Sequence, residues 1–209
     1  MFEAFTNPAG GNFTIEARRL PHTIDADLMT RLLEFTPANA LEVRDKAMME
    51  LLYSSGLRLS ELTGLGLHDV DLADRTARVT GKGAKQRIAP VGRQAIEAVR
   101  AWLRERPGLA KPDETALFTG QNGRRIGQRA VQLRIAAHAR RMGVPLKVHP
   151  HLFRHSFATH LLESSRDLRG VQELLGHANI STTQIYTHLD FQHLARTYES
   201  SHPRARRRG

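Results

Sequence analysis

Apolar residues recur at helical spacing along most of the chain. In residues 43–55 they occupy positions 43, 47, 48, 51 and 52, which lie on one face of a helix. Gly56 follows directly, and glycine is the residue that most readily adopts the left-handed conformation that ends a helix. The same spacing predicts helices over residues 94–106 and 127–142. In the second of these we expect the basic residues to point outward and three apolar residues to point inward, namely Val131, Ile135 and Met142.

Capping residues predict where other helices start. Asp25 or Thr23 can cap a first helix that ends near residue 35, because their side-chain oxygens can accept from the free N–H groups of the first turn. Ser60 is the expected cap of a short helix around residues 59–62. Pro150 suits the first turn of a further helix, where its missing N–H costs nothing.

Two more helices are expected towards the C-terminal end. Asp167 can cap one that Gly176 closes. The sequence "STTQ" at residues 181–184 fits a capping box, in which two side chains accept hydrogen bonds from each other's backbone N–H groups. A helix that begins there carries Tyr186 in its second turn.

The pattern changes between residues 70 and 91. The stretches "RTARVT" (75–80) and "QRIAPV" (86–91) are typical of β-strands. Between them, "GKGAK" (81–85) has the glycines of a hairpin turn. The chain is therefore predicted to be mainly α, with a small antiparallel β-sheet.

Composition narrows the class of protein. The chain has 209 residues, which suits one large domain or two small ones. It has no cysteine, which excludes disulfides and thiolate sites and suits a cytoplasmic protein. No run of about 18 apolar residues or secretory signal is present, so we expect no membrane partner. Residues 1–21 are interpreted as a leader or linker, residues 22–200 as the folded domain, and residues 201–209 as a basic C-terminal tail.

The charge favours a polyanionic partner. Thirty-one Lys and Arg stand against 21 Asp and Glu, a formal net charge of +10. Such an excess suits nucleic acid, because every neutralised phosphate releases counterions, although a merely basic surface is the alternative. The placement of arginines between residues 124 and 141 favours nucleic acid: Arg124, Arg125, Arg129, Arg134, Arg140 and Arg141.

Tyr186 is a candidate nucleophile. A free phenol has a pKa of about 10, so it needs positive charge or a base to react at neutral pH. A tyrosine that only packs its ring is the alternative. His177 precedes the predicted helix of Tyr186 and could hydrogen-bond to whatever the tyrosine attacks.

The sequence "HLFRH" supplies a second group of polar side chains. His151 and Arg154 are three residues apart, on one face of a helix, and an arginine fork with a histidine beside it can bind phosphate oxygens. An ordinary surface pair is the alternative. A zinc site is disfavoured, because no acidic residue lies between residues 149 and 160 and the HExxH pattern is absent.

Arg58 and Lys82 complete the set. Arg58 follows a helix stop, with Glu61 three residues later to orient it, although a surface ion pair would look the same. Lys82 lies in a Gly-Lys-Gly turn that can approach a ligand closely, or that only exposes a solvated lysine. Two arginines, two histidines, a lysine and a tyrosine are together what metal-free attack on a phosphodiester requires.

Several motifs in this order resemble the catalytic domain of the tyrosine recombinases, the phage integrase family, a DNA breaking-rejoining enzyme fold. They are "GLRLSEL", "GKGAKQR", "HPHLFRHSFATHLL", "LLGHANISTTQIYTHLD" and "HPRARRR". The resemblance is greatest to the Xer chromosome-dimer resolvases, on the XerC branch, and it runs from about residue 20 to the C-terminus. It implies that Tyr186 is the nucleophile, that Lys82 is the general acid, and that four residues assist: Arg58, His151, Arg154 and His177.

The resemblance also implies the function. We expect a site-specific recombinase that cleaves DNA through a 3′-phosphotyrosyl link during chromosome dimer resolution at cell division, with no cofactor. A type IB topoisomerase-like activity and a non-catalytic DNA-binding module are the alternatives. The expected partners are a double-stranded recombination site, recombinase subunits in a XerC/XerD-type heterotetramer, and a DNA translocase as activator. Full-length members carry an N-terminal helical domain, which we expect this chain to lack.

The helix over residues 127–142 is expected to meet DNA. Its apolar stripe leaves the polar side chains outward, and the corresponding helix of the family approaches the major groove. Three residues are the expected contacts: Gln128, Arg129 and Gln132.

Overall fold

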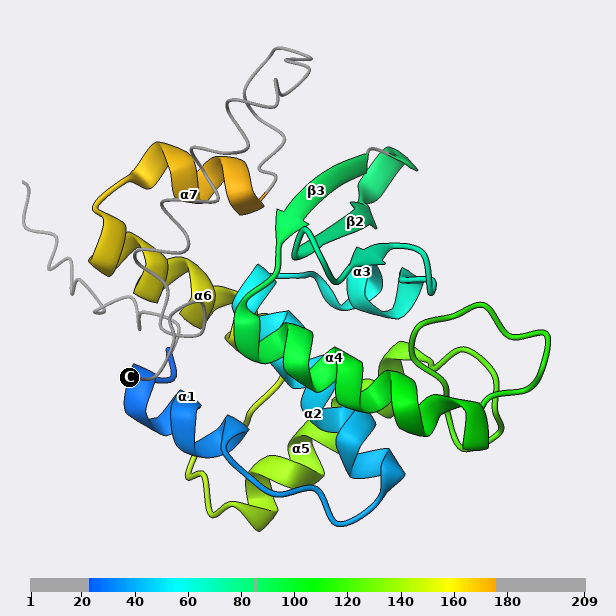
Figure 1. Cartoon of the computed structure of the whole chain (residues 1–209). Coiled ribbons are helices and arrows are strands. Elements are labelled where there is room, and N and C mark those ends of the chain that lie inside the picture. Colours follow the sequence, from blue (N-terminus) through cyan, green and yellow to red (C-terminus); the bar gives the residue numbers. More distant parts are fainter. Residues whose placement is uncertain (1–22, 85, 176–209) are drawn as a thin grey trace, which may run out of the picture.

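The central element of the fold is helix α2, Ala40–Ser55. The computed structural model describes residues 23–84 and 86–175. Helix α4 (Arg93–Glu105) runs along α2, and α6 (Pro150–Ser165), α5 (Gln128–Arg141) and α1 (Ala26–Leu33) also pack on it (Figure 1). Side chains are buried almost all the way round α2, as expected for a helix enclosed by others.

A small sheet and two short helices complete the architecture. Strands β1 (Val70–Asp71), β2 (Thr76–Thr80) and β3 (Gln86–Pro90) form an antiparallel sheet in the order β1-β2-β3. Helix α3, Leu59–Gly64, packs on β2, and α7, Leu168–Leu175, follows α6. In Figure 1 the sheet and α3 lie above α4, and α6 and α7 lie at the upper left, near the N-terminal end of α4. The predicted class, mainly α with a small antiparallel sheet, is confirmed.

The pleat of the hairpin decides which side chains of β3 face the core. Ala77 and Val79 on β2 are buried, and Ala77 pairs with the buried Ala89 on β3. Arg87 pairs with Val79, so it shares this inner face, because alternate residues of a strand point the same way. Ile88, between Arg87 and Ala89, points to the outer face and is exposed. The charged side chain of Arg87 therefore lies on the buried face of the sheet.

Most of the helix starts follow from their caps. Asp25 accepts a hydrogen bond from Leu28 N at 2.7 Å, and Asp167 accepts one from Gly170 N at 2.9 Å. Helix α2 begins three residues before the expected position, because Asn39 caps it by accepting from Glu42 N at 3.1 Å. The expected cap at Ser60 is wrong: Ser60 lies inside α3, which starts after Arg58.

The structure confirms two of the three residues that were expected to point inward from α5. Val131 and Ile135 are buried, but Met142 is 38% exposed. Met142 follows the last helical residue, Arg141, and its backbone leaves the helical conformation (φ −79°, ψ 2°). The apolar stripe therefore ends earlier than the sequence spacing predicts.

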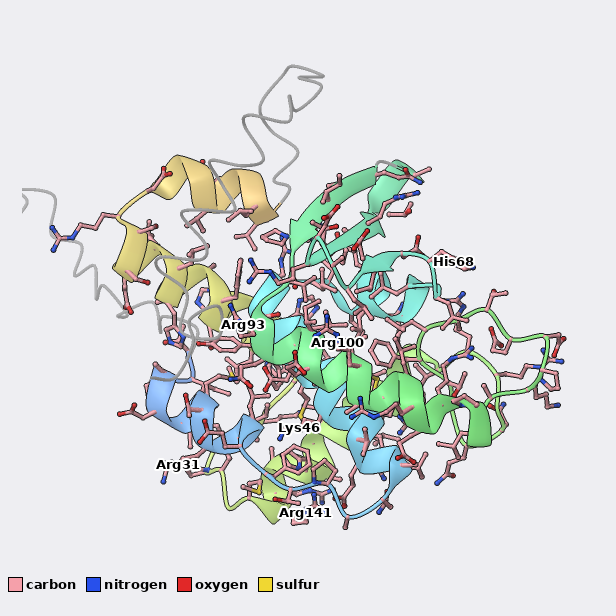
Figure 2. The ribbon with its side chains drawn as sticks, in the orientation of Figure 1. Arg31, Lys46, His68, Arg93, Arg100 and Arg141 are labelled. Atoms are coloured by element: carbon pink, nitrogen blue, oxygen red, sulfur yellow. The ribbon has the colours of Figure 1, made fainter. Side chains whose placement is uncertain are left out.

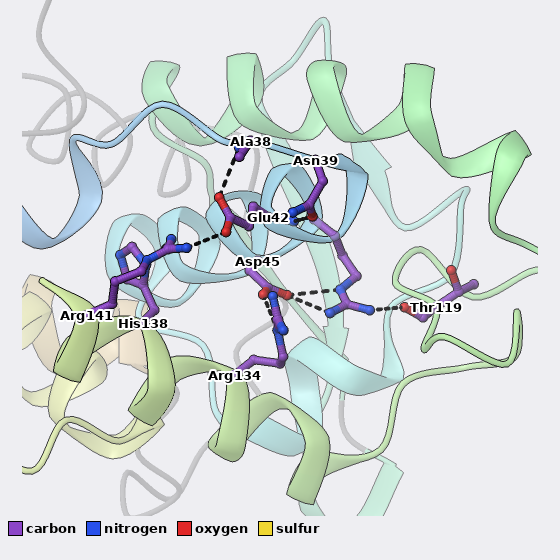
Figure 3. A network of polar contacts seen from close by, with 9 residues as sticks. Ala38, Asn39, Glu42, Asp45, Thr119, Arg134, His138 and Arg141 are labelled. Carbon is purple, nitrogen blue, oxygen red and sulfur yellow. Dashed lines mark hydrogen bonds and ion pairs between the residues drawn. The ribbon is translucent and has the colours of Figure 1, made fainter.

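Two arginines of α5 bind carboxylates of α2 (Figure 3). Arg134 Nε lies 2.5 Å from Asp45 Oδ2, and Arg44 contacts the other oxygen of the same carboxylate at 2.7 Å. Arg141 pairs with Glu42 one turn earlier on α2. The side chains of Arg134 and Arg141 remain 38% and 52% exposed, as expected for the outward face of α5, and their guanidinium groups bond to buried carboxylates on α2.

The same interface contains a buried histidine, His138. Its Nε2 donates to Leu32 O at 2.8 Å. Its Nδ1 accepts from Nη2 of Arg141 at 3.2 Å, which fits a neutral ring; Figure 3 shows His138 and Arg141 together on α5. Burial lowers the pKa of His138, and the charge of Arg141 lowers it further. Burial also lowers the pKa of His160, whose Nδ1 lies 2.8 Å from the hydroxyl of Tyr53.

We predict that the free energy of unfolding falls as the pH drops below about 6.5. The pKa of both histidines is lower in the folded chain, so the unfolded chain binds protons first. The stability that the two neutral histidines contribute is present above their pKa in the unfolded chain. It is lost as the pH falls towards their lower pKa in the folded chain. Urea unfolding at about pH 7.5 and about pH 5.5 should differ by on the order of 1 kcal/mol. His138→Gln should reduce this difference, and an unchanged difference would contradict the assignment.

Candidate active site

The candidate site forms where α2 ends, α3 begins and α6 passes. Gly56 ends α2 in the left-handed conformation (φ 57°). A Cβ atom on Gly56 would lie 2.5 Å from Cδ1 of Phe157 on α6, so only glycine permits this approach. The close contact brings Arg58, two residues after Gly56, next to the α6 residue Arg154.

Arg58 is oriented by a buried carboxylate, Glu61. The backbone N–H of Arg58 donates to Glu61 Oε2 at 2.7 Å, and its guanidinium Nη1 donates to Oε1 at 3.0 Å. The Glu61 side chain is 1% exposed, whereas the Arg58 side chain is 40% exposed. The carboxylate is therefore fixed inside the fold and holds a guanidinium that remains open to a ligand.

Arg154 is held by two backbone carbonyls from distant parts of the chain. Its Nη1 donates to Gly56 O, and its Nη2 donates to Leu175 O at 2.6 Å. Arg154 thus joins the C-terminal ends of α2 and α7. Cations are favoured at such helix ends, because the last carbonyls of a helix have no partner within it.

Burial and neighbouring charges shift the pKa of both Glu61 and Arg154. Burial would raise the pKa of Glu61, but the charge of Arg87 and the hydrogen bonds from Arg58 and Arg87 outweigh it and hold the pKa below its usual value. For Arg154, burial first and then repulsion by Arg58 and Arg87 lower the pKa to about 10. Three guanidinium groups therefore surround one carboxylate, which leaves excess positive charge suited to an anion.

The structure places four of the six predicted site residues. Arg58 and Arg154 meet at the end of α2. Lys82 starts the turn Lys82–Ala84 between β2 and β3, and its side chain lies outside the described residues. His151 is exposed in the first turn of α6, one turn before Arg154 and on the same face. His177 and Tyr186 lie outside the described residues.

Sequence reasoning missed Arg87. Its Nη2 lies 3.0 Å from Glu61 Oε2, and its Nη1 donates to Leu174 O at 2.8 Å. A signal was available, because in "QRIAPV" the alternation that places Ala89 inward also places Arg87 inward. A charged residue at an inward position of a strand requires a buried partner.

Comparison with known proteins assigns the chain to a family. The sequence profile of the phage integrase family matches residues 22–193. The chain belongs to the phage integrase family. It is also 60% identical over 192 residues to the tyrosine recombinase XerC of Pseudomonas fluorescens, which covers 91% of this chain and 63% of the relative. The chain therefore spans less than two thirds of the curated relative that it matches.

Solved structures of family members share the fold. The XerA recombinase is 32% identical and superposes with a TM-score of 0.69, covering 88% of this chain and 66% of XerA. The XerH recombinase bound to its palindromic difH substrate, in a post-cleavage complex, is 28% identical with a TM-score of 0.68. The match covers 87% of this chain and 53% of XerH.

The arginines between residues 124 and 141 divide into two groups. Arg124 pairs with Asp113 at 2.8 Å, and Arg125 donates to the carbonyls of Thr63 and Leu65, while Arg134 and Arg141 bind α2. Arg129 is exposed and makes no hydrogen bond or ion pair with residues 23–84 or 86–175. Arg140 donates to Ala136 O within α5 at 3.4 Å, so five of the six arginines in this stretch bond to other described residues.

Neither a metal cluster nor a membrane span occurs within the described part of the chain. No three His, Asp or Glu residues gather there in a way that could hold a metal ion. None of the helices described is long and apolar enough to span a lipid bilayer.

We predict that Glu61→Gln destabilises the fold by about 3 kcal/mol, because it leaves three arginines at a buried corner without a counter-charge. The matched control is Glu97→Gln, which breaks an exposed pair of the same spacing with Arg100 and should cost less than about 1 kcal/mol. Urea unfolding of both variants at neutral pH measures the difference. Equal losses in the two variants would mean that the Glu61 cluster is no stronger than a surface pair.

Proposed function

We propose that the chain is the catalytic part of a site-specific DNA recombinase that acts through a covalent 3′-phosphotyrosyl intermediate. The observation that carries the proposal is the meeting of Arg58 and Arg154 at one corner, with Glu61 buried behind them. Both residues match the arginine positions of the family motifs. Their charge exceeds that of the single carboxylate, so the corner suits the phosphate of a DNA strand.

The proposed reaction is an in-line displacement at phosphorus. The Tyr186 oxygen forms a bond to the phosphorus atom, and the bond from phosphorus to the 5′ oxygen breaks. Lys82 gives a proton to the departing oxygen, and a histidine, His151 or His177, takes the phenol proton. Arg58 and Arg154 stabilise the charge that develops on the non-bridging oxygens. The phosphotyrosine conserves the energy of the phosphodiester bond, so the strand can be resealed without ATP.

The relatives support the proposed partners. The XerH structures contain a DNA substrate, and the XerC relative carries the name of a tyrosine recombinase. By extension, we propose that the natural ligand is a double-stranded recombination site and that partner recombinase subunits of the XerC/XerD type assemble on it. Chromosome dimer resolution at cell division, with a DNA translocase as activator, is the proposed cellular setting.

We predict that the 209-residue chain forms a covalent adduct with a nicked DNA substrate that carries its recombination site, and that Tyr186→Phe abolishes the adduct. Only a hydroxyl is lost, so DNA affinity should stay within about twofold. Tyr53→Phe is the matched control, because that hydroxyl is buried against His160 and cannot reach DNA. Denaturing gel electrophoresis and mass spectrometry identify the adduct.

The outcomes separate the three candidate functions. No adduct with wild-type protein, together with site-specific binding, would favour the non-catalytic binding module. Adduct formation followed by relaxation of supercoiled DNA, without exchange between two sites, would favour the topoisomerase-like activity. An adduct that persists in Tyr186→Phe would overturn the assignment of the nucleophile.

We predict that Arg129→Ala weakens binding to the recombination site and makes the dependence of log K on log salt shallower by about one unit, the effect of losing one phosphate contact. Gln128 and Gln132 lie on the same N-terminal part of α5, which gives this surface its proposed role in DNA contact. The charge-matched control is Arg100→Ala, on α4 (Figure 2), where Glu97 already pairs with the arginine. Equal changes in the two variants would refute the placement of α5 on DNA.

A further inference from the structure

We infer that Arg87 is a positioning residue for the nucleophile: it fixes the end of α7, and so fixes where the segment that carries His177 and Tyr186 begins. This inference rests on the proposed function, since it concerns the same site. Family motifs assign chemistry to Arg58, Lys82 and Arg154, but none of that chemistry explains why a third arginine is buried beside them. Its contacts in the fold provide the explanation.

Arg87 joins three elements that are distant in sequence. It lies on the inner face of β3, its Nη2 is 3.0 Å from the Glu61 carboxylate of α3, and its Nη1 donates to Leu174 O of α7 at 2.8 Å. The side chain is 14% exposed. Each of its two terminal nitrogens thus makes a bond inside the protein, and the inference assigns Arg87 its role through these two partners.

A second arginine binds the carbonyl that follows Leu174 O in the sequence. Arg87 holds Leu174 O and Arg154 holds Leu175 O, so two guanidiniums bind consecutive carbonyls in the last turn of α7. These carbonyls have no partner within the helix and carry its negative end, which makes them natural partners of arginine. Buried Val171, Leu174 and Leu175 hold the other face of α7. The two arginines and the buried apolar side chains together fix the position and the direction of the C-terminal end of α7.

This end of α7 matters because the proposed nucleophile lies a short distance after it in the sequence. His177 is two residues after Leu175, and Tyr186 is nine residues after His177. Arg58 and Glu61 lie in the part of the site that is proposed to bind the phosphate. Leu174 lies in α7, the helix that precedes the proposed nucleophile in the sequence. Arg87 connects these two parts directly through Glu61. A displacement of about 1 Å between reacting groups can slow a reaction about a hundredfold, so a fixed connection of this kind affects the rate.

Arg87 also lies on the hairpin of Lys82, which raises a competing explanation. Loss of Arg87 could shift the hairpin and with it the general acid. The two explanations differ in chemistry. A substrate with a 5′-bridging sulfur expels a thiolate, which needs no protonation, and so it bypasses a misplaced general acid but not a misplaced nucleophile.

The kinetic test measures single-turnover adduct formation at saturating DNA. Arg87→Met should lower the rate constant about a hundredfold and change the dissociation constant less than about threefold. Arg87→Lys keeps the charge but cannot bridge both partners, so it should recover no more than about a tenth of the wild-type rate. The matched control is Arg78→Met, an exposed arginine on the outer face of the same sheet, with a rate close to wild type.

The sulfur substrate then separates nucleophile from general acid. It should restore adduct formation by Lys82→Ala and leave Arg87→Met slow. Restoration of Arg87→Met by the sulfur substrate would overturn the inference, because Arg87 would then act through Lys82. A wild-type rate for Arg87→Met on the ordinary substrate would overturn it as well.

A second readout needs no catalysis. Amide hydrogen exchange of free Arg87→Met should be faster than wild type in α7, Leu168–Leu175, and unchanged in α2. Unchanged exchange in α7 would overturn the inference, and so would faster exchange throughout α2, which would indicate a general loss of stability. Absence of an adduct in wild-type protein would instead refute the proposed function, while the exchange experiment would still decide whether Arg87 holds α7.

Discussion

The carboxylate of Glu61 is the interaction on which the rest of the site depends. Arg58, Arg87 and Arg154 converge on one corner of the fold, where burial and their mutual repulsion lower the pKa of Arg154 to about 10. Glu61 is the group that opposes this repulsion, through direct bonds to Arg58 and Arg87. Because Glu61 is buried and bonded to both, Arg58 and Arg87 keep fixed directions before any ligand arrives, and two backbone carbonyls hold Arg154. Such preorganisation is the main source of electrostatic catalysis in enzymes.

Helix α2 connects this corner to the proposed DNA surface. At its N-terminal end, Glu42 and Asp45 bind two arginines of α5, and at its C-terminal end the carbonyl of Gly56 accepts a hydrogen bond from Arg154. One buried helix thus fixes the helix proposed to contact DNA and the arginine proposed to contact the scissile phosphate. The distance between these two contacts is set by the core, and so does not depend on exposed loops.

The amino-acid sequence was sufficient to predict most elements and part of the site, because periodicity, caps and motifs are local properties. Asp25, Gly56 and Asp167 act as predicted, whereas the expected cap at Ser60 failed because Glu61 bonds to the backbone N–H of Arg58 and starts the helix earlier. The partners of Arg87, Arg134 and Arg141 were not predicted, for one shared reason. Each forms a long-range ion pair, and a linear sequence shows charges but not which of them fold onto one another.

The most direct test of this account is the location of a bound phosphate analogue. A crystal of the chain soaked in tungstate can be measured at the tungsten absorption edge, where the anomalous signal marks the anion. The account predicts a peak within hydrogen-bonding distance of the guanidiniums of Arg58 and Arg154, which disappears in Glu61→Gln crystals as Arg58 loses its orientation. A tungstate bound elsewhere, with none between Arg58 and Arg154, would contradict it.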